Sequence, residues 1–256
     1  MPELIPGLVS ITFRPLSPQQ LIELVAKAGL KAIEWGGDVH VPHGDIARAK
    51  EVRRQTADSG LSVAAYGSYY RIGASEAKGL SFASVLDSAV ALGAPTIRVW
   101  GGVKGSRDTT PSEREEIVAD ALRIADLAKE QGVTISLEYH ADTLTDARDS
   151  ARTLMEEITH PNFIFLWQTA NGEGVEQNIA RLHDVTPRMG NIHVFHWWPT
   201  GADRKSLVDG EDRWKQYLDI IRATGKSRAF LLEFVRGDSQ DQFLEDAATL
   251  RRWLES

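Results

Sequence analysis

One unit recurs along this chain: an amphipathic helical stretch, a glycine that stops it, and a short run rich in Val, Ile, Leu and aromatic residues. The stopping glycines are Gly29, Gly60, Gly93 and Gly132, each placed where a helix closes in the left-handed conformation that glycine adopts at low cost. Helical stretches that alternate with short apolar runs are typical of parallel βα units. The repeat therefore predicts a parallel sheet or barrel covered by helices.

The number of apolar runs favours a closed barrel. Eight runs predict eight strands, at about 7–13, 32–35, 62–67, 96–100, 134–139, 163–168, 191–195 and 229–234. Ser17-Pro18 and Thr110-Pro111 read as N-caps followed by a first-turn proline, and Glu113 adds a capping-box acid. Eight strand and helix pairs in 256 residues fit a single (β/α)8 TIM barrel over residues 1–256. An open doubly wound sheet, which usually has fewer strands, is the alternative.

Composition excludes several classes of function. The net charge is -7 and basic residues are scattered among acids, which argues against nucleic acid as a partner. The absence of cysteine excludes disulfides, thiolate metal sites and cysteine nucleophiles. The sequence shows neither a signal-like start nor a run of about 18 apolar residues. We therefore expect a cytoplasmic protein with no membrane contact.

Alternation along the strands shows which side chains point into the predicted barrel. One parity of each strand is apolar and should face the helices, which leaves the other parity to face the barrel axis. By this rule the fifth strand ends on an inward Glu138, and the eighth strand on an inward Glu233. The same alternation turns four further polar side chains inward: Glu34, Arg98, Gln168 and His193.

Two carboxylates at one end of a barrel need a positive group between them. Glu138 and Glu233 would repel each other and take up protons unless a cation lay nearby. Carboxylate, amide and imidazole donors suit a hard divalent ion, so we expect one metal ion, with Mn or Mg preferred and Co or Zn possible. The alternative is a simple ion pair with a neighbour such as Arg98 and no metal.

The strand-end motifs, taken together, resemble those of a known barrel family. They are Ala32-Ile33-Glu34-Trp35, Ile97-Arg98-Val99-Trp100-Gly101-Gly102, Leu137-Glu138-Tyr139-His140, Ile192-His193-Val194 and Leu232-Glu233-Phe234. Each is a weak signal alone, but their order and spacing over the whole chain are specific. The chain resembles the xylose isomerase-like TIM barrel superfamily, in its sugar phosphate isomerase/epimerase branch.

The resemblance implies a metal site and a reaction. The family's four ligands fall by position on Glu138, Gln168, His193 and Glu233. Gln168 departs from the pattern, because the family usually has an aspartate there, and its neutral amide oxygen should weaken metal binding. A rim residue that touches no metal is the other reading of Gln168. The resemblance further implies that Glu138 and Glu233 move a proton to and from a carbon beside a carbonyl, while the metal stabilises the enediolate.

Residues at the same rim are candidates for contact with a small sugar-like substrate. The candidates are Glu34, His43, Tyr66, Arg98, His140, His196, Trp198 and Arg204. His196 also rivals His193 as the metal ligand, although parity favours His193. Aromatic faces for a sugar are offered by Trp35, Tyr66, Tyr69, Tyr70, Trp100, Trp197 and Trp198, of which Trp35 is expected to pack outward. The loop after the seventh strand is expected to form a substrate lid or a homo-oligomer contact.

Three functions are therefore open. The first is a metal-dependent isomerase or epimerase of a small sugar or polyol ketone. The second is a lyase or dehydratase on the same scaffold, because the same proton abstraction can end in loss of a β-substituent. The third is a carbohydrate-binding or partner subunit without turnover, which Gln168 motivates.

Overall fold

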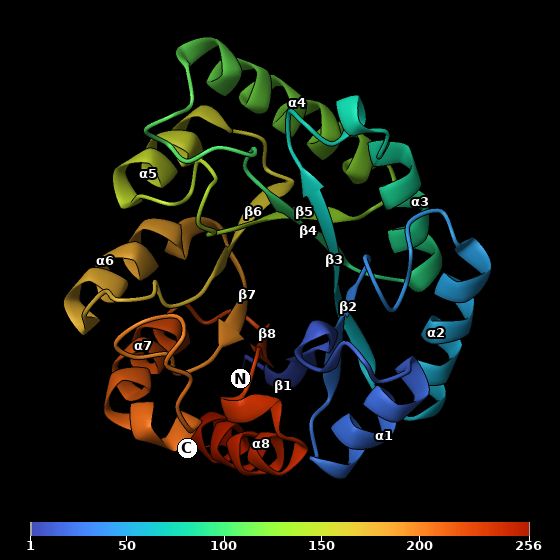
Figure 1. The fold of residues 1–256 in the computed structure, drawn as a ribbon, viewed down its shortest axis with the longest axis vertical. Helices are drawn as coiled ribbons and strands as arrows, with labels where there is room; N and C mark the ends of the chain where they lie inside the picture. Colours follow the sequence, from blue (N-terminus) through green and yellow to red (C-terminus); the bar gives the residue numbers. More distant parts are fainter. Residues whose placement is uncertain (1, 256) are drawn as a thin grey trace.

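A closed barrel of eight parallel strands forms the centre of the molecule, and eight α-helices surround it (Figure 1). The computed structural model describes residues 2–255. The strands are β1 (Leu4–Val9), β2 (Ala32–Gly36), β3 (Ser62–Arg71), β4 (Thr96–Trp100), β5 (Thr134–Glu138), β6 (Phe163–Trp167), β7 (Met189–Val194) and β8 (Arg228–Leu232). Each strand pairs with its sequence neighbours, and β1 closes the ring on β8. The predicted TIM barrel is confirmed.

The helices follow the strands in the order that the repeat predicted. They are α1 (Pro18–Lys27), α2 (Ile46–Asp58), α3 (Phe82–Leu92), α4 (Pro111–Glu130), α5 (Arg148–Glu157), α6 (Val175–Val185), α7 (Glu211–Ala223) and α8 (Gln240–Glu255). Short 3-10 helices are η1 (Ser10–Phe13), η2 (Glu76–Lys78), η3 (Thr186–Arg188), η4 (Leu207–Gly210) and η5 (Arg236–Asp238). Ser17 and Thr110 each form a capping box, with Gln20 and Glu113 respectively.

The first strand differs most from its predicted range. It was expected at about 7–13, but β1 ends at Val9 and the chain turns into η1. The Ser10 hydroxyl accepts the Gly36 N–H at 2.9 Å, and Phe13 packs edge-on against Phe243. These tertiary contacts draw the apolar residues after Val9 away from the sheet, which the apolar pattern alone could not show.

The barrel interior has two layers with different chemistry. Its lower part is filled by small and apolar side chains, from Val9, Ala32, Ala64, Ala229 and Leu231. Five buried charged or ionisable side chains gather toward the carboxyl ends of the strands, from Glu34, Arg98, Glu138, His193 and Glu233. Larger apolar residues fill the space between the strands and the helices. The architecture therefore places a charged layer beside an apolar cluster inside the barrel, and a cavity opens on the charged side.

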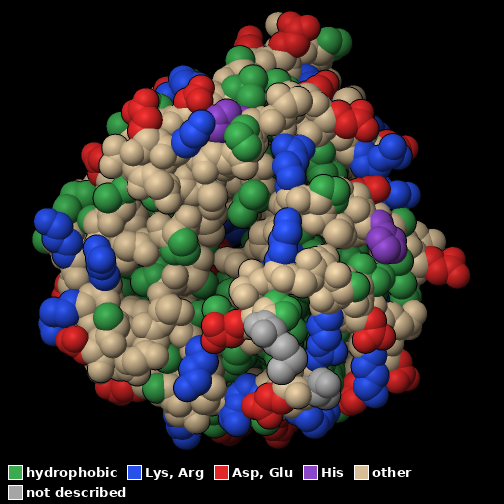
Figure 2. Space-filling model, turned by 180° about the vertical axis from the view of Figure 1, so that it is seen from behind, with side chains coloured by type: hydrophobic (Ala, Val, Ile, Leu, Met, Phe, Trp, Pro, Cys, Tyr) green, Lys and Arg blue, Asp and Glu red, His purple; other side chains and the backbone are tan. Residues whose placement is uncertain are grey.

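The outer surface carries both signs of charge. On the face opposite to that of Figure 1, Lys and Arg side chains are interspersed with Asp and Glu (Figure 2). Over residues 2–255, no helix is long and apolar enough to cross a membrane.

Candidate active site

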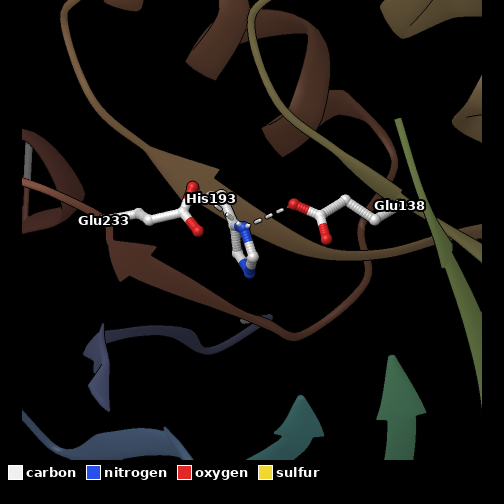
Figure 3. A group of neighbouring side chains, drawn as sticks. All are labelled: Glu138, His193 and Glu233. Atoms are coloured by element: carbon white, nitrogen blue, oxygen red, sulfur yellow. Dashed lines mark ion pairs between the residues drawn. The ribbon is translucent and has the colours of Figure 1, made fainter. Parts of the chain in front are cut away.

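Glu138, His193 and Glu233 come together at the carboxyl ends of β5, β7 and β8. One ligand atom from each lies within 4.8 Å of the other two, and all three residues are buried. Figure 3 shows the imidazole of His193 between the two carboxylates. His193 Nδ1 lies 3.4 Å from Glu233 Oε2 and 3.8 Å from Glu138 Oε1. Alternation on three regular strands is sufficient to bring these side chains together.

A fully buried ion network supports this group from one side. Glu34 accepts the Arg98 Nε–H at 2.6 Å through one oxygen, and its other oxygen lies 3.1 Å from His193 Nε2. Arg98 Nη1 donates to Glu138 Oε2 at 2.5 Å, and Trp100 Nε1 donates to the same oxygen at 2.5 Å. Glu34 therefore orients His193 directly and Glu138 through Arg98, so that Nδ1 and Oε1 remain turned toward each other.

The pKa values in this network follow from its charges. Burial opposes ionisation of Glu34, but Arg98 and His193 outweigh it and lower the pKa of Glu34 to about 2. Burial also opposes protonation of His193, yet the negative charges of Glu233 and Glu34 raise the pKa of His193 to about 10. Without a metal ion, His193 is therefore protonated at neutral pH and itself balances the carboxylates.

The donor set fits a hard divalent ion. Gln168 Oε1 is buried and has no hydrogen-bond partner in the described part of the chain, and His193 Nδ1 lies at ion-pair distance from Glu138 and Glu233. A buried polar atom without a partner costs free energy, and a cation would remove that cost. Ligand distances of about 2.0–2.2 Å separate two ligand atoms by roughly 3 to 4.4 Å, close to the observed spread. The buried Glu138, His193 and Glu233 could thus hold a metal ion.

Metal affinity is expected to rise with pH. Because the pKa of His193 is raised to about 10, an ion must displace its proton at any lower pH. The affinity for Mn²⁺ should therefore increase by about tenfold per pH unit between roughly pH 6 and 8. Titration calorimetry in buffers of different ionisation enthalpy would measure the affinity and the proton released. A pH-independent affinity with no proton release would contradict this assignment.

A cavity of about 510 Å³ opens above the charged layer. Five residues predicted for the site line it: Arg98, Glu138, His140, Gln168 and Glu233. His140 lies against Trp100, with ring centroids 4.3 Å apart. Tyr69, Trp197 and Phe234 add aromatic walls. The cavity therefore offers carboxylates at its base and aromatic faces at its sides, which suits a small polar molecule.

The other predicted substrate contacts lie outside the lining of this cavity. Glu34 is fully buried beneath it. Tyr66 is aligned with Trp35 and Ile97 in the neighbouring strands, so its side chain points outward as theirs do. The Tyr66 hydroxyl hydrogen-bonds to His43, which therefore lies on the same outer side. His196 follows β7 and lines a separate small pocket beside Arg213.

Trp198 and Arg204 belong to the loop after β7, and they too lie outside the cavity lining. The Arg213 guanidinium lies 3.8 Å from the Trp198 ring, and Arg204 pairs with Asp238 at 2.6 Å. Only Trp197 of this loop reaches the cavity, where it stacks on Phe195 at 4.0 Å. The loop therefore contributes one aromatic wall to the site.

Several lining residues carry no signal in strand alternation. Arg14 lies just after η1, Asp146 lies between β5 and α5, and Glu173 and Arg181 lie beyond β6. The Arg181 guanidinium pairs with Glu173 at 2.6 Å and 2.7 Å. These residues are far apart in sequence and outside regular strands, so only the folded chain shows that they share a wall.

Comparisons with known proteins agree with this architecture. A curated relative, 3-dehydroshikimate dehydratase of Bacillus anthracis, is 35% identical over 79 residues. That match spans only 28% of this chain and 28% of the relative. Two solved structures share the fold over nearly their full lengths.

The first solved structure is a probable 3-DHS dehydratase, AsbF, from Bacillus anthracis, with a TM-score of 0.81 and 20% identity over 98% of this chain and 99% of that one. The second is a D-allulose 3-epimerase from Methylomonas, with a TM-score of 0.72 and 14% identity over 99% of both chains. The family profile described as xylose isomerase-like TIM barrel matches residues 22–255. The expected resemblance is thus confirmed, and the chain belongs to the xylose isomerase-like TIM barrel family.

Proposed function

We propose that this chain is a metal-dependent enzyme that removes a proton beside the carbonyl of a small hydroxylated substrate. The observation that carries the proposal is the convergence of Glu138, His193 and Glu233 within 4.8 Å, where the two glutamates also line a cavity. Gln168, whose free oxygen is buried in the same lining, would be the fourth ligand. Bound Mn²⁺ or Mg²⁺, with Co²⁺ or Zn²⁺ as alternatives, would polarise the carbonyl and stabilise the negative charge formed as the proton leaves.

The two carboxylates are suited to different roles. Glu138 Oε2 accepts hydrogen bonds from Arg98 and Trp100, which leaves only Oε1 for a ligand role. The Glu233 carboxylate lacks such donors, and its Oε2 lies 3.4 Å from His193 Nδ1. Two donors already occupy Glu138 Oε2, which restricts how that carboxylate can turn toward a substrate. We therefore assign proton removal to Glu233, and metal binding to both.

Arg98 and His140 are the substrate contacts that we propose from the predicted set, because both line the cavity. Arg98 can donate to a substrate oxygen while it stays paired with Glu34 and Glu138. The His140 imidazole lies against Trp100, and its Nδ1 is 2.7 Å from the Ala141 carbonyl, so Nδ1 carries the hydrogen. This fixes one tautomer, in which Nε2 can accept a hydrogen bond from a substrate hydroxyl.

A single free carboxylate favours elimination. Glu233 would take the proton, the electron pair of the broken C–H bond would form a carbon–carbon double bond, and Glu233 would return that proton to the β-hydroxyl, which would leave as water and restore the carboxylate. Epimerisation requires proton carriers on both faces of the carbon, and Glu138 would have to leave its donors to serve as the second. The local likeness to 3-dehydroshikimate dehydratase supports the lyase reading.

The isomerase or epimerase is the second candidate. The ligand atoms of both carboxylates lie in one group within 4.8 Å, so both could reach the same carbon. The likeness in fold to a D-allulose 3-epimerase is compatible with this reading. The two candidates share the first chemical step and differ in the product.

Proton exchange tests the shared step, and product analysis separates the outcomes. The Mn²⁺-loaded protein would be incubated in D₂O with 3-dehydroshikimate and, separately, with D-allulose. We expect deuterium beside the carbonyl or a dehydrated product from the first compound. Conversion of D-allulose to its epimer would instead establish the epimerase. If the protein binds no stoichiometric metal and Mn²⁺ gives no thermal stabilisation, the non-catalytic binding subunit is the correct reading.

A further inference from the structure

Gln168 is the uncharged member of the proposed ligand set, and its orientation is fixed. Its Nε2 donates to the Tyr139 carbonyl oxygen at 2.8 Å. Since a carbonyl oxygen only accepts hydrogen bonds, the nitrogen must face Tyr139 and Oε1 must face the other way. That oxygen is buried and has no partner among the described residues. The amide therefore contributes a neutral oxygen, and no negative charge, to the lining of the cavity.

The charges of the buried layer can be added. Glu34, Glu138 and Glu233 are negative and Arg98 is positive, and all four are buried. His193 must be neutral when it binds an ion, so the layer then carries a net charge of minus two. A divalent ion brings this sum to zero. The charged residues of the cavity wall are counted apart from this layer: Arg14 pairs with Asp38, Arg181 pairs with Glu173, and Asp146 accepts a hydrogen bond from the Ser106 N–H.

A neutral metal layer admits an anion without net repulsion. With a carboxylate in place of Gln168, the loaded layer would carry minus one and would repel a negative oxygen that approaches the ion. Such repulsion is strong where water is largely excluded, and the layer lies on an apolar floor formed by residues that include Ala229 and Leu231. The neutral amide thus removes an obstacle that a fourth negative ligand would create.

We propose that Gln168 adapts this site to a substrate that meets the metal through a negatively charged oxygen, namely a hydroxylated carboxylic acid. The inference rests on the proposed function, because it requires the metal, and it adds the charge class of the substrate. A neutral ketose lacks such an oxygen before proton removal.

The test compares an acid with its neutral amide of nearly the same shape. Mn²⁺-loaded protein, freed of unbound metal, would be titrated with ¹³C-labelled glycolate and with glycolamide. Relaxation of the carbon signals by Mn²⁺ reports binding near the ion without any turnover. We expect the wild type to bind glycolate at least roughly tenfold more tightly than glycolamide. We expect Gln168→Glu to bind Mn²⁺ about tenfold more tightly and to lose the preference for glycolate.

Asn171→Asp is the matched control. Asn171 lines the same cavity, so this variant adds the same charge without altering the proposed ligand set. It should leave Mn²⁺ affinity within about twofold of the wild-type value and retain most of the glycolate preference. The inference is wrong if Mn²⁺ binds but the wild type does not prefer glycolate, or if Gln168→Glu keeps that preference. If wild-type protein binds no Mn²⁺, the proposed metal-dependent function itself fails.

Discussion

Glu233→Gln is expected to lower turnover and substrate proton exchange by roughly 100- to 10,000-fold at saturating Mn²⁺. The amide has nearly the shape of the carboxylate but cannot take a proton. Glu233 is the carboxylate at the cavity base that lacks the two donors holding Glu138, which is why the role of base is assigned to it. Deuterium incorporation followed by NMR measures the exchange, and metal analysis of the purified variant verifies that the ion is present.

Glu138→Gln is the matched comparison for this prediction. Because Glu138 Oε2 is held by Arg98 and Trp100, its replacement should mainly weaken Mn²⁺ binding and spare most of the rate once the metal is saturating. Equal losses of exchange in both variants at saturating metal would contradict a single proton carrier. They would favour the two-carrier epimerase instead.

Arg98→Met is expected to destabilise the metal-free protein by about 3–5 kcal/mol. Arg98 is 2% exposed and bridges Glu34 and Glu138, which are themselves buried. Removing the guanidinium leaves two buried carboxylates with only His193 as a positive neighbour. Thermal unfolding should shift down by roughly 10 °C. Saturating Mn²⁺ should recover part of the loss, because the ion replaces some of the missing positive charge.

Arg54→Met gives the control for this stability measurement. The Arg54 and Asp58 side chains are 68% and 63% exposed, and a pair of this kind contributes at most about 1 kcal/mol. The proposed network would be disproved as a source of stability if Arg98→Met unfolded within 1 °C of the Arg54→Met control, about the size of a surface effect.

How far the sequence predicts this molecule depends on the regularity of each strand. On β5 and β7, and at the residue directly after β8, alternation alone places Glu138, His193 and Glu233 inward, because side chains in a regular strand alternate strictly. On β3 the pairing with β4 is irregular between Gly67 and Tyr70. Within that stretch Tyr69 adopts a φ of 56°, which is rare for a bulky residue, and turns its ring to the cavity. The alternation of apolar and polar residues in the sequence does not predict this position of Tyr69.

For the residues of the ion network, the sequence predicts which side chains point inward better than it predicts which side chains they contact. Parity indicates that Glu34 and Arg98 face inward, and the rim position suggested contact with substrate. The structure instead buries Glu34 completely between Arg98 and His193. Whether a charged group meets solvent or another charge depends on side chains contributed by distant segments, here 64 and 159 positions away along the chain. Such pairing is a tertiary property that one sequence does not encode locally.

The apolar floor of the barrel imposes an order of events on the proposed enzyme. Val9, Ala32, Ala64, Ala229 and Leu231 pack as an apolar cluster inside the barrel, whereas the cavity opens beside the proposed ligands, so we expect an ion to arrive and depart by way of the mouth. A substrate bound at that mouth would block the path by which the ion leaves. Metal must load first and substrate second, and a bound substrate should slow the release of metal to chelators.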